Sequence, residues 1–421
     1  MTSKRTGDSL LRGGRVERSG LAADGRLPRS LRRARLAVHV TEHPVPTFNA
    51  RLTGLSCFSC GTAHDHRVIQ GVCRACGLPL RVDYAIGRGD LPRPRLASRV
   101  ASLWRYREVL PIAADEVTLA EGWTPLVAVG DGVWIKDEAR NPTGSFKARG
   151  MSAAVSAALA LGARALVAPS AGNAAGALAA YGAAARLPVT VAMPDDTPRG
   201  CIEECRLYGA TVHLVPGTIA DAGRWLREHG PADAVDVSTL REPYRIEGKK
   251  TMAYELYEQL DGRLPDVIVY PTGGGTGLVG MWKAFGEMRA LGWLDADAPL
   301  PRFVSVQAAG CAPVVRGFES GADRTEPWVD ARTQAYGLRV PSPIGGFLCL
   351  RALRETGGTA YAVPEAEIAP VVRRVAAATG LDVCPETGAA WAALEQLRAS
   401  GWVRASDRVV VFNTGTGLKY R

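Results

Sequence analysis

A lysine in an unusual setting is the first candidate for chemistry in this sequence. Lys147 lies in N-P-T-G-S-F-K-A-R-G, residues 141–150, behind a Pro/Gly turn and beside an aromatic residue. The apolar alternation at 133–136 predicts a strand before it, and the Ala-rich stretch from Met151 predicts a helix after it. A lysine on a loop that opens a helix can be partly desolvated, which lowers its pKa and frees the amine for Schiff-base chemistry. The alternative is an ordinary solvated lysine near a helix start.

A glycine-rich loop is the second candidate, because P-T-G-G-G-T-G-L at 271–278 follows an apolar strand pattern and precedes a helix expected from about Val279. Its glycines let the backbone approach an anion, and the helix start adds a favourable dipole. The loop is neither a Walker loop nor a dinucleotide fingerprint. We expect phosphate binding, with a purely structural turn as the alternative, at Gly273, Gly274, Gly275, Thr276 and Gly277.

Two further turns follow predicted strands, P-S-A-G-N-A-A-G at 169–176 and F-N-T-G-T-G-L-K at 412–419. The first opens a helix whose free backbone N–H groups suit a carboxylate, while the amide of Asn173 can bond a ring hydroxyl. The second places the hydroxyl of Thr414 at a strand end. Structural turns are the alternative for both. The predicted carboxylate loop consists of Ser170, Ala171 and Gly172.

Four of the nine cysteines form two close pairs with the spacing C-x2-C-x12-C-x2-C, each followed by a glycine. Two such turns can supply four thiolates to a tetrahedral zinc ion. A degenerate site and a redox role are the alternatives. We expect His64 and His66, between the pairs, to face solvent because four sulfurs already close the site. The predicted metal ligands are Cys57, Cys60, Cys73 and Cys76.

Composition and charge are those of an ordinary soluble globular protein, with 421 residues, 47% hydrophobic and 22% charged. No apolar run reaches the ~18 residues that a membrane span needs. The net charge of +9 is concentrated in residues 1–36, which hold ten Lys or Arg against three acids. We expect a disordered basic tail there, with a transit peptide or a nucleic-acid-binding arm as alternatives. The near-neutral remainder gives no electrostatic reason to expect a nucleic-acid partner.

Short apolar runs alternate with helical stretches from about residue 100 onward, which predicts a parallel α/β sheet with ligands at the carboxyl ends of its strands. The segment 88–95 reads as a linker, because its prolines and charges disfavour packing. The odd cysteine count and the lack of a signal-peptide pattern point to the reducing cytoplasm. The predicted strands lie at 165–168, 189–193, 211–215, 267–270, 303–307 and 409–412.

Together the lysine, the asparagine turn, the glycine loop and the threonine strand end resemble the fold-type II (tryptophan synthase β-like) enzymes that depend on pyridoxal phosphate (PLP). The resemblance covers roughly residues 50–421. It implies an α/β fold of two parallel-sheet, three-layer domains with PLP in the cleft, preceded by a zinc ribbon. The expected boundaries are 50–86 for the ribbon and 95–421 for the catalytic body, whose smaller subdomain covers roughly 150–250.

The resemblance also implies roles for individual residues. Lys147 would carry PLP and act as the base, and Asn173 would face the 3′ oxygen of the ring. The loop at 273–277 would hold the phosphate, and the loop at 170–172 would hold the substrate carboxylate. Thr414 would contact the pyridine nitrogen, and a hydroxyl there suits eliminations and replacements more than transamination.

Two charged residues complete the expected site. Arg245, in Y-R-I-E-G-K-K-T with Lys249 and Lys250, aligns with a substrate-phosphate arginine of threonine synthases; a solvated charged loop is the alternative. Glu386 resembles a family element near the cofactor; the alternative is a first-turn glutamate that favours the helix dipole.

Within the family, the zinc ribbon and T-G-T-G-L-K favour threonine synthase, a lyase of amino-acid biosynthesis that converts O-phospho-L-homoserine and water to L-threonine and phosphate. Three departures weaken this assignment. Ala148 stands where Asp is usual, Ala171 and Ala174 where Thr is usual, and Thr239-Leu240 where Asn-Ser is usual. Each lost hydroxyl or amide is worth about 1–3 kcal/mol on a charged partner.

The departures leave a second interpretation, a β-eliminating or β-replacing enzyme that acts on Ser, Thr, diaminopropionate or a related amino acid. A non-catalytic zinc-ribbon scaffold is the third. In the first two cases the partner is a small amino acid. A homodimer is compatible with the resemblance, since the family often forms dimers.

Overall fold

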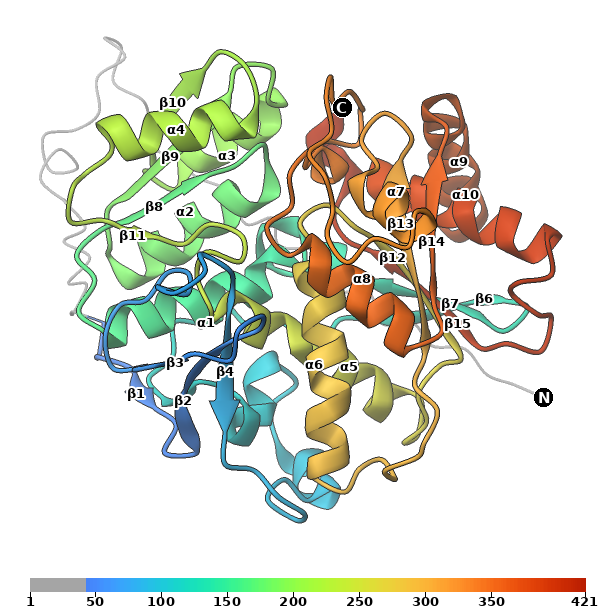
Figure 1. Cartoon of the computed structure of the whole chain (residues 1–421), viewed down its shortest axis with the longest axis horizontal. Helices are drawn as coiled ribbons and strands as arrows, with labels where there is room; N and C mark the ends of the chain where they lie inside the picture. Colours follow the sequence, from blue (N-terminus) through green and yellow to red (C-terminus); the bar gives the residue numbers. More distant parts are fainter. Residues whose placement is uncertain (1–42) are drawn as a thin grey trace, which may run out of the picture. The chain divides into compact units, whose positions relative to one another are not determined.

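Two largely parallel sheets organise the part of the chain that the computed structural model describes, residues 43–421 (Figure 1). One has four strands in the order β10-β9-β8-β11, and the other has six in the order β14-β13-β12-β15-β7-β6. Every pair in both sheets is parallel except β6 with β7. The predicted α/β fold with parallel sheets is thus confirmed. The basic tail predicted for residues 1–36 lies outside the described residues.

The four-stranded sheet is sandwiched between helices. Helix α4 covers one face, where Ala222 and Leu226 pack on strand residues such as Val167. Helices α1, α2 and α3 bury the other face. The elements are β8 (Leu166–Pro169), β9 (Val189–Pro194), β10 (Thr211–Val215), β11 (Val235–Asp236), α1 (Lys147–Ala160), α2 (Asn173–Ala185), α3 (Arg199–Leu207) and α4 (Ile219–His229).

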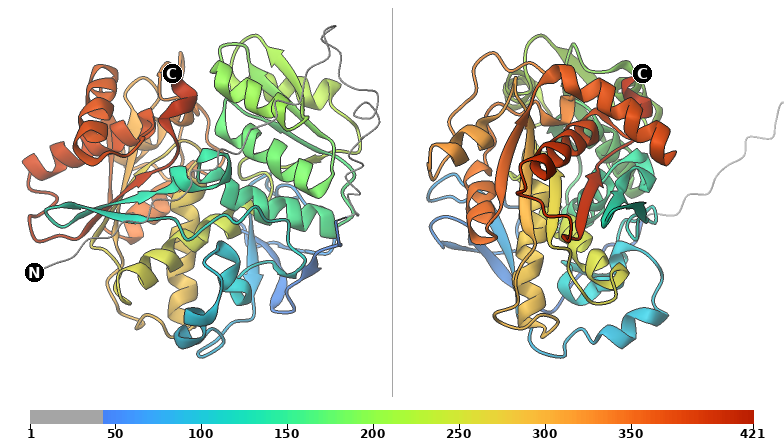
Figure 2. Two further views of the ribbon diagram at one scale, coloured as in Figure 1. Left: turned by 180° about the vertical axis from the view of Figure 1, so that it is seen from behind. Right: turned by 90° about the vertical axis from the view of Figure 1, so that its right-hand side faces the viewer.

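The six-stranded sheet is also covered on both faces (Figure 2). Val267 and Val269 of β12 pack with α9 and α10, whereas Ile268 and Tyr270 join the core with α5, α6 and α8. Burial on both faces explains why these strands read as continuous apolar runs. The elements are β6 (Leu126–Gly130), β7 (Val133–Asp137), β12 (Val267–Pro271), β13 (Arg302–Ala308), β14 (Thr359–Val363), β15 (Val409–Asn413), α5 (Arg245–Gln259), α6 (Thr276–Ala290), α7 (Pro313–Glu319), α8 (Gly346–Glu355), α9 (Glu365–Thr379) and α10 (Pro385–Ala399).

Each of the six predicted apolar runs overlaps one of these parallel strands. The predicted linker at 88–95 behaves differently from the expectation, because Leu91 is only 1% exposed and its carbonyl accepts a hydrogen bond from Trp293 Nε1 at 2.8 Å. One leucine among charged residues and prolines is enough to anchor the segment to the core. None of the helices between His43 and Arg421 combines the length and apolar character that crossing a bilayer requires.

The cysteine-bearing segment forms a small antiparallel sheet in the order β3-β2-β4. Its strands are β2 (Leu52–Cys57), β3 (Ala63–His64) and β4 (Leu80–Tyr84), and β1 (Thr47–Phe48) pairs with β5 (Ile112–Ala114). The segment touches the start of α5, since Tyr84 donates to Glu247 at 2.9 Å and Tyr244 donates to the carbonyl of His66 at 3.2 Å.

Helix α1 packs against both α2 and α5, and so lies between the cores of the two sheets. Its contact with α5 includes a close approach of the two backbones, besides the bonds from the Arg149 side chain to Thr251 and Glu255. A Cβ placed on Gly248 of α5 would lie 1.8 Å from the carbonyl oxygen of Arg149 in α1, so only glycine fits at this crossing. The two helices are therefore locked together at the point where both begin.

Candidate active site

A pocket lies where the carboxyl ends of strands from both sheets meet. It is bounded by the loops after β8 and β12, by the end of β15 and by the start of α1, as expected for ligand sites in parallel α/β sheets. Arg245 does not line it. The predicted residues that do are Lys147, Ser170, Ala171, Gly172, Asn173, Gly273, Gly274, Gly275, Thr276, Gly277, Glu386 and Thr414.

Lys147 is the first residue of α1, so the helix begins four residues earlier than the Ala-rich stretch predicts. The loop before it is held by a bond from Phe146 N–H to the carbonyl of Thr414 at 3.1 Å. Its Nζ lies 4.0 Å from the centroid of the Phe146 ring and, within residues 43–421, has no hydrogen-bond or carboxylate partner. Burial, helped by the charge of Arg245, lowers the pKa of Lys147 to about 8. About a tenth of its amine is therefore neutral at pH 7, far more than for an ordinary lysine.

Two more buried cations lie close to this lysine. Arg245 is 1% exposed, and its Nη1 donates to the Val237 carbonyl at 2.8 Å while its Nε and Nη2 have no partner. Lys249 is fully buried, with its Nζ 2.8 Å from Thr276 Oγ1. Burial lowers the pKa of Arg245 to about 10 and the pKa of Lys249 well below its usual value. Burial thus disfavours the charged forms of these groups, and an anion that reaches them would favour the charged forms again.

Glu242, whose charge acts on Arg245 and Lys249, does not form a salt bridge with either of them. Glu242 accepts the backbone N–H groups of Tyr244 at 2.7 Å and of Arg245 at 2.8 Å instead. Burial raises the pKa of Glu242 to about 7, so near neutral pH it supplies only part of a negative charge. The charge of Glu386 also acts on Lys147, but within residues 43–421 no carboxylate forms a salt bridge with any of the three cations.

The glycine loop lies beside this cation cluster. Gly275 has φ +78°, and a Cβ there would lie 2.2 Å from Cys349 Sγ, so both its conformation and its surroundings require glycine. Because Lys249 donates to Thr276 Oγ1, the hydroxyl proton of Thr276 is free to bond another acceptor. Backbone donors at the start of α6, a free hydroxyl and a buried ammonium together fit a phosphate group.

The asparagine turn is also built for an anion. Ser170 Oγ accepts the N–H groups of Gly172 at 3.3 Å and Ala175 at 3.1 Å, which fixes the turn from within. Among the described residues, the N–H groups of Asn173 and Ala174, the first two of α2, have no hydrogen-bond partner, whereas those of Ala175 and Gly176 bond the Gly172 carbonyl. Asn173 itself is held by two residues from the far end of the chain, Lys419 and Tyr420.

Thr414, directly after β15, and Glu386, at the start of α10, also line the pocket. Thr414 Oγ1 lies 3.7 Å from Cys384 Sγ. Glu386 is 4% exposed; its Oε1 accepts from Gly337 N–H at 2.7 Å and from Tyr420 at 3.1 Å, while its Oε2 has no partner. A hydroxyl and a free carboxylate oxygen are thus available to a ligand.

Sequence reasoning missed one wall of the pocket. Residues 336–340 and Tyr420 line it, and Arg339 forms a two-pronged salt bridge with Asp196 at 2.7 and 2.8 Å. The string Y-G-L-R-V carries no glycine pattern or periodicity that could have pointed to a site. Tyr420 could have been suspected, because it directly follows the predicted motif at 412–419.

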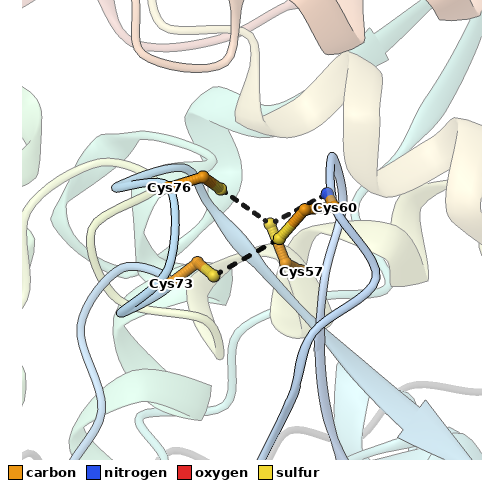
Figure 3. A group of neighbouring side chains, drawn as sticks. All are labelled: Cys57, Cys60, Cys73 and Cys76. Atoms are coloured by element: carbon orange, nitrogen blue, oxygen red, sulfur yellow. Dashed lines mark hydrogen bonds between the residues drawn. The ribbon is translucent and has the colours of Figure 1, made fainter.

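The four paired cysteines meet in space, with their sulfurs turned toward one another from two separate turns (Figure 3). Cys57 Sγ lies 3.4 Å from Cys76 Sγ, Cys60 Sγ lies 3.6 Å from Cys73 Sγ, and all four sulfurs are within 4.8 Å of one another. Tetrahedral zinc thiolates with bonds of about 2.3 Å need sulfurs about 3.8 Å apart, which fits.

The histidine between the cysteine pairs is less exposed than predicted. His64 is half-buried, and its Nε2 lies 3.4 Å from Cys73 Sγ, because β3 pairs with β2 and brings it over the cluster. His64 therefore contacts the cluster of four cysteines but is not one of its members. His66 is also half-buried and packs its ring edge-on against Phe48, with centroids 5.9 Å apart.

Comparison with known proteins agrees with this geometry. Residues 117–415 match the family described as "Pyridoxal-phosphate dependent enzyme". The threonine synthase of Methanosarcina acetivorans is 34% identical over 87% of this chain and 92% of its own length. That of Methanocaldococcus jannaschii is 32% identical over 86% and 92%. A fungal L-serine ammonia-lyase from Rhizomucor miehei has a similar fold, with a TM-score of 0.58 at 21% identity over 71% of this chain and 97% of the other.

The chain therefore belongs to the family of pyridoxal-phosphate dependent enzymes. The family named from the sequence motifs is thus confirmed, and among its members the chain is similar to threonine synthases along most of its length.

Proposed function

We propose that the protein is a PLP-dependent lyase of the threonine synthase type, which converts O-phospho-L-homoserine and water to L-threonine and phosphate. The observation that carries this proposal is the cluster of half-buried Lys147 with buried Arg245 and Lys249, none of which forms a salt bridge within residues 43–421. We assign the glycine loop and Lys249 to the phosphate of the cofactor. Arg245 still has two unpaired guanidinium nitrogens, which supports a second phosphate, carried by the substrate.

The reaction needs only a few tasks from the chain itself. When bound, PLP supplies a ring that stabilises negative charge at the substrate Cα. The turn at 170–173 binds the substrate carboxylate through backbone N–H groups. The Lys147 amine, with its pKa lowered to about 8, takes up the proton from Cα. Thr414 and Asn173 hold the ring by hydrogen bonds, and Arg245 neutralises the departing phosphate.

A second candidate keeps the same residues but changes the substrate. Ala171 and Ala174 give the carboxylate turn methyl groups where a hydroxyl would grip a phosphorylated side chain. This apolar wall favours a smaller substrate such as Ser, Thr or diaminopropionate, from which β-elimination would release ammonia.

An assay of the holoenzyme for phosphate release and ammonia release separates the two candidates. We expect O-phospho-L-homoserine to yield equal amounts of phosphate and threonine, and Lys147→Ala to lower the rate at least about 10³-fold because both the attachment point and the base are lost. Arg245→Met should raise KM for O-phospho-L-homoserine more than it lowers kcat. If serine, threonine or diaminopropionate yields ammonia while O-phospho-L-homoserine yields no phosphate, the second candidate is correct and the first is wrong.

We also propose that Cys57, Cys60, Cys73 and Cys76 hold a structural zinc ion, as a ribbon over residues 50–86. The sulfur spacing and the two glycine turns at Gly61 and Gly77, both with φ +71°, support this. Because Tyr84 and Tyr244 join this segment to the start of α5, loss of the metal would also loosen the surroundings of Arg245.

Metal analysis tests the zinc proposal. The purified protein should contain about one zinc per chain, and a strong chelator should lower its Tm in a way that added zinc reverses. The Cys60→Ser variant should lose the metal, while Lys147, the predicted attachment point of PLP, is unchanged in it. A metal-free protein with an unchanged Tm after chelation would contradict the proposal.

A further inference from the structure

The last described residues form a short segment across the pocket, here called the strap, residues 416–421. Its backbone is fixed to the loop that leads to Lys147, since Thr416 N–H donates to the Gly144 carbonyl at 2.8 Å. A 3-10 turn, Gly417–Tyr420, follows; it places Tyr420 in the pocket lining and Lys419 beside Asn173. The strap thus extends from the lysine loop to the asparagine turn of the four-stranded sheet.

Lys419 is the side chain that makes this connection. Its Nζ donates to the carbonyl of Thr143 at 2.7 Å, to Asn173 Oδ1 at 3.1 Å and to Glu204 Oε2 at 2.6 Å. An ammonium group has three protons, so these three acceptors use all of them. Lys419 therefore has a single defined position, with one partner before α1, one at the start of α2 and one on α3.

The chain makes room for the counter-charge of this lysine. Glu204 is largely buried, and a Cβ on Gly176 of α2 would lie 1.9 Å from its Oε2. Burial raises the pKa of Glu204, while the Lys419 ammonium opposes that shift. The carboxylate therefore occupies a space that exists only because residue 176 is glycine, and it faces Lys419.

The position of Lys419 decides how the Asn173 amide is turned. An ammonium group can only donate, so the amide atom beside it must be the carbonyl oxygen. The NH2 end then points the other way, where one proton reaches Tyr420 at 3.3 Å and the other faces the pocket. A ring oxygen of the cofactor is an acceptor, so this is the end that it requires.

We propose that Lys419 is a positioning residue, which fixes the Asn173 amide with its N–H group toward the ring oxygen of bound PLP. This inference rests on the role of Asn173 under the proposed function. Without Lys419, the amide can rotate by half a turn and present its oxygen, which would repel the ring oxygen rather than bind it.

A double-mutant cycle on PLP binding tests the proposal. We would measure the dissociation constant of PLP by titrating cofactor-free protein, and record the absorption maximum of the Lys147-bound cofactor. Asn173→Ala and Lys419→Met should each weaken binding about tenfold and shift the maximum alike. The double variant should bind no more weakly than Asn173→Ala alone, because Lys419 acts through Asn173.

The matched control is Arg421→Met, which removes a cation from the same strap. Arg421 is 63% exposed and pairs with Asp382 at 2.6 Å, away from Asn173, so PLP binding should stay unchanged. Glu204→Gln keeps the shape of the carboxylate but weakens its hold on Lys419, and should weaken PLP binding about threefold. This second variant keeps the test usable if Lys419→Met does not fold.

The outcomes separate the two proposals. If the effects of Lys419→Met and Asn173→Ala multiply in the double variant, or if Lys419→Met and Glu204→Gln both leave binding and absorption unchanged, Lys419 is not a positioning residue. If Asn173→Ala itself leaves PLP binding unchanged, the proposed role of Asn173 is wrong, and the inference about Lys419 is overturned with it.

Discussion

Two adjacent lysines on α5, Lys249 and Lys250, are both fully buried, but only one of them is paired. Lys250 Nζ contacts Glu247 at 2.5 Å and Glu287 at 2.9 Å. Lys249 Nζ contacts only the hydroxyl of Thr276 among the hydrogen-bond and salt-bridge partners in residues 43–421. The first lysine is satisfied by the fold alone, whereas the second is satisfied only when an anion enters the site.

A second paired cluster lies under the lysine loop. Arg149, two residues after Lys147, is bonded to Glu138 at 2.6 Å and to Glu255 at 2.5 Å, and Lys136 bonds Glu255 at 2.7 Å. All of these side chains are fully buried. Paired buried charges thus hold α1 and α5 to the six-stranded sheet, while unpaired ones face the pocket. On α5, therefore, charged residues in salt bridges stabilise the fold, whereas those without a salt bridge are available to bind an anion.

The largest expected effect comes from breaking the paired cluster. Arg149→Met leaves two buried carboxylates without their main partner and should lower the free energy of unfolding by about 3–5 kcal/mol. Urea unfolding followed by circular dichroism measures this. Arg140→Met is the matched control, because Arg140 is exposed, and it should change stability by less than about 0.5 kcal/mol. Equal effects of the two variants would remove the distinction.

The comparison is tested most directly by replacing each of the two lysines with methionine. Lys250→Met should cost about 2 kcal/mol of stability, less than for Arg149 because Lys283 still contacts both carboxylates. Lys249→Met should leave the stability of the cofactor-free protein unchanged or higher, since it removes an unpaired buried amine. It should weaken PLP binding about tenfold instead. Loss of stability in Lys249→Met with unchanged PLP affinity would reverse the assignment.

The pH dependence of stability tests the unpaired state of Lys147. Its pKa is about 8 in the folded chain, against 10.5 in the unfolded chain, which binds the proton more tightly. Below about pH 8 the buried charge therefore destabilises the cofactor-free protein, and this penalty disappears as the pH rises toward 10.5. Lys147→Met should be more stable by about 3 kcal/mol at pH 7, with a difference of about 1 kcal/mol at pH 10. A difference that does not change with pH would contradict it.

An exposed pair at the mouth of the pocket should matter least. Asp196, whose side chain is 48% exposed, pairs with Arg339. Asp196→Asn should change the free energy of unfolding by less than about 1 kcal/mol, because solvent screens such pairs. Thermal unfolding at low and high salt would check this. A larger, salt-independent loss would place this pair with the buried clusters.

The fold and the pocket were predictable where one local pattern carries the information. Apolar runs predicted the strands, and the lysine string and glycine loop predicted segments that do line one pocket. The state of Lys249 and Lys250 was not predictable, because successive residues of a helix point about 100° apart and their partners, such as Thr276, lie about 30 residues away. The wall at 336–340 has no pattern at all and is placed only by tertiary packing.

The backbone contact between α1 and α5 determines whether the three basic groups come together during folding or on ligand binding. Lys147 is carried by α1, and Arg245 and Lys249 by α5, and the crossing at Gly248 leaves no gap through which the helices could shift. The three like charges are therefore gathered during folding, not when a ligand arrives. An entering anion finds these basic groups already assembled and has no rearrangement to drive, which favours tighter binding.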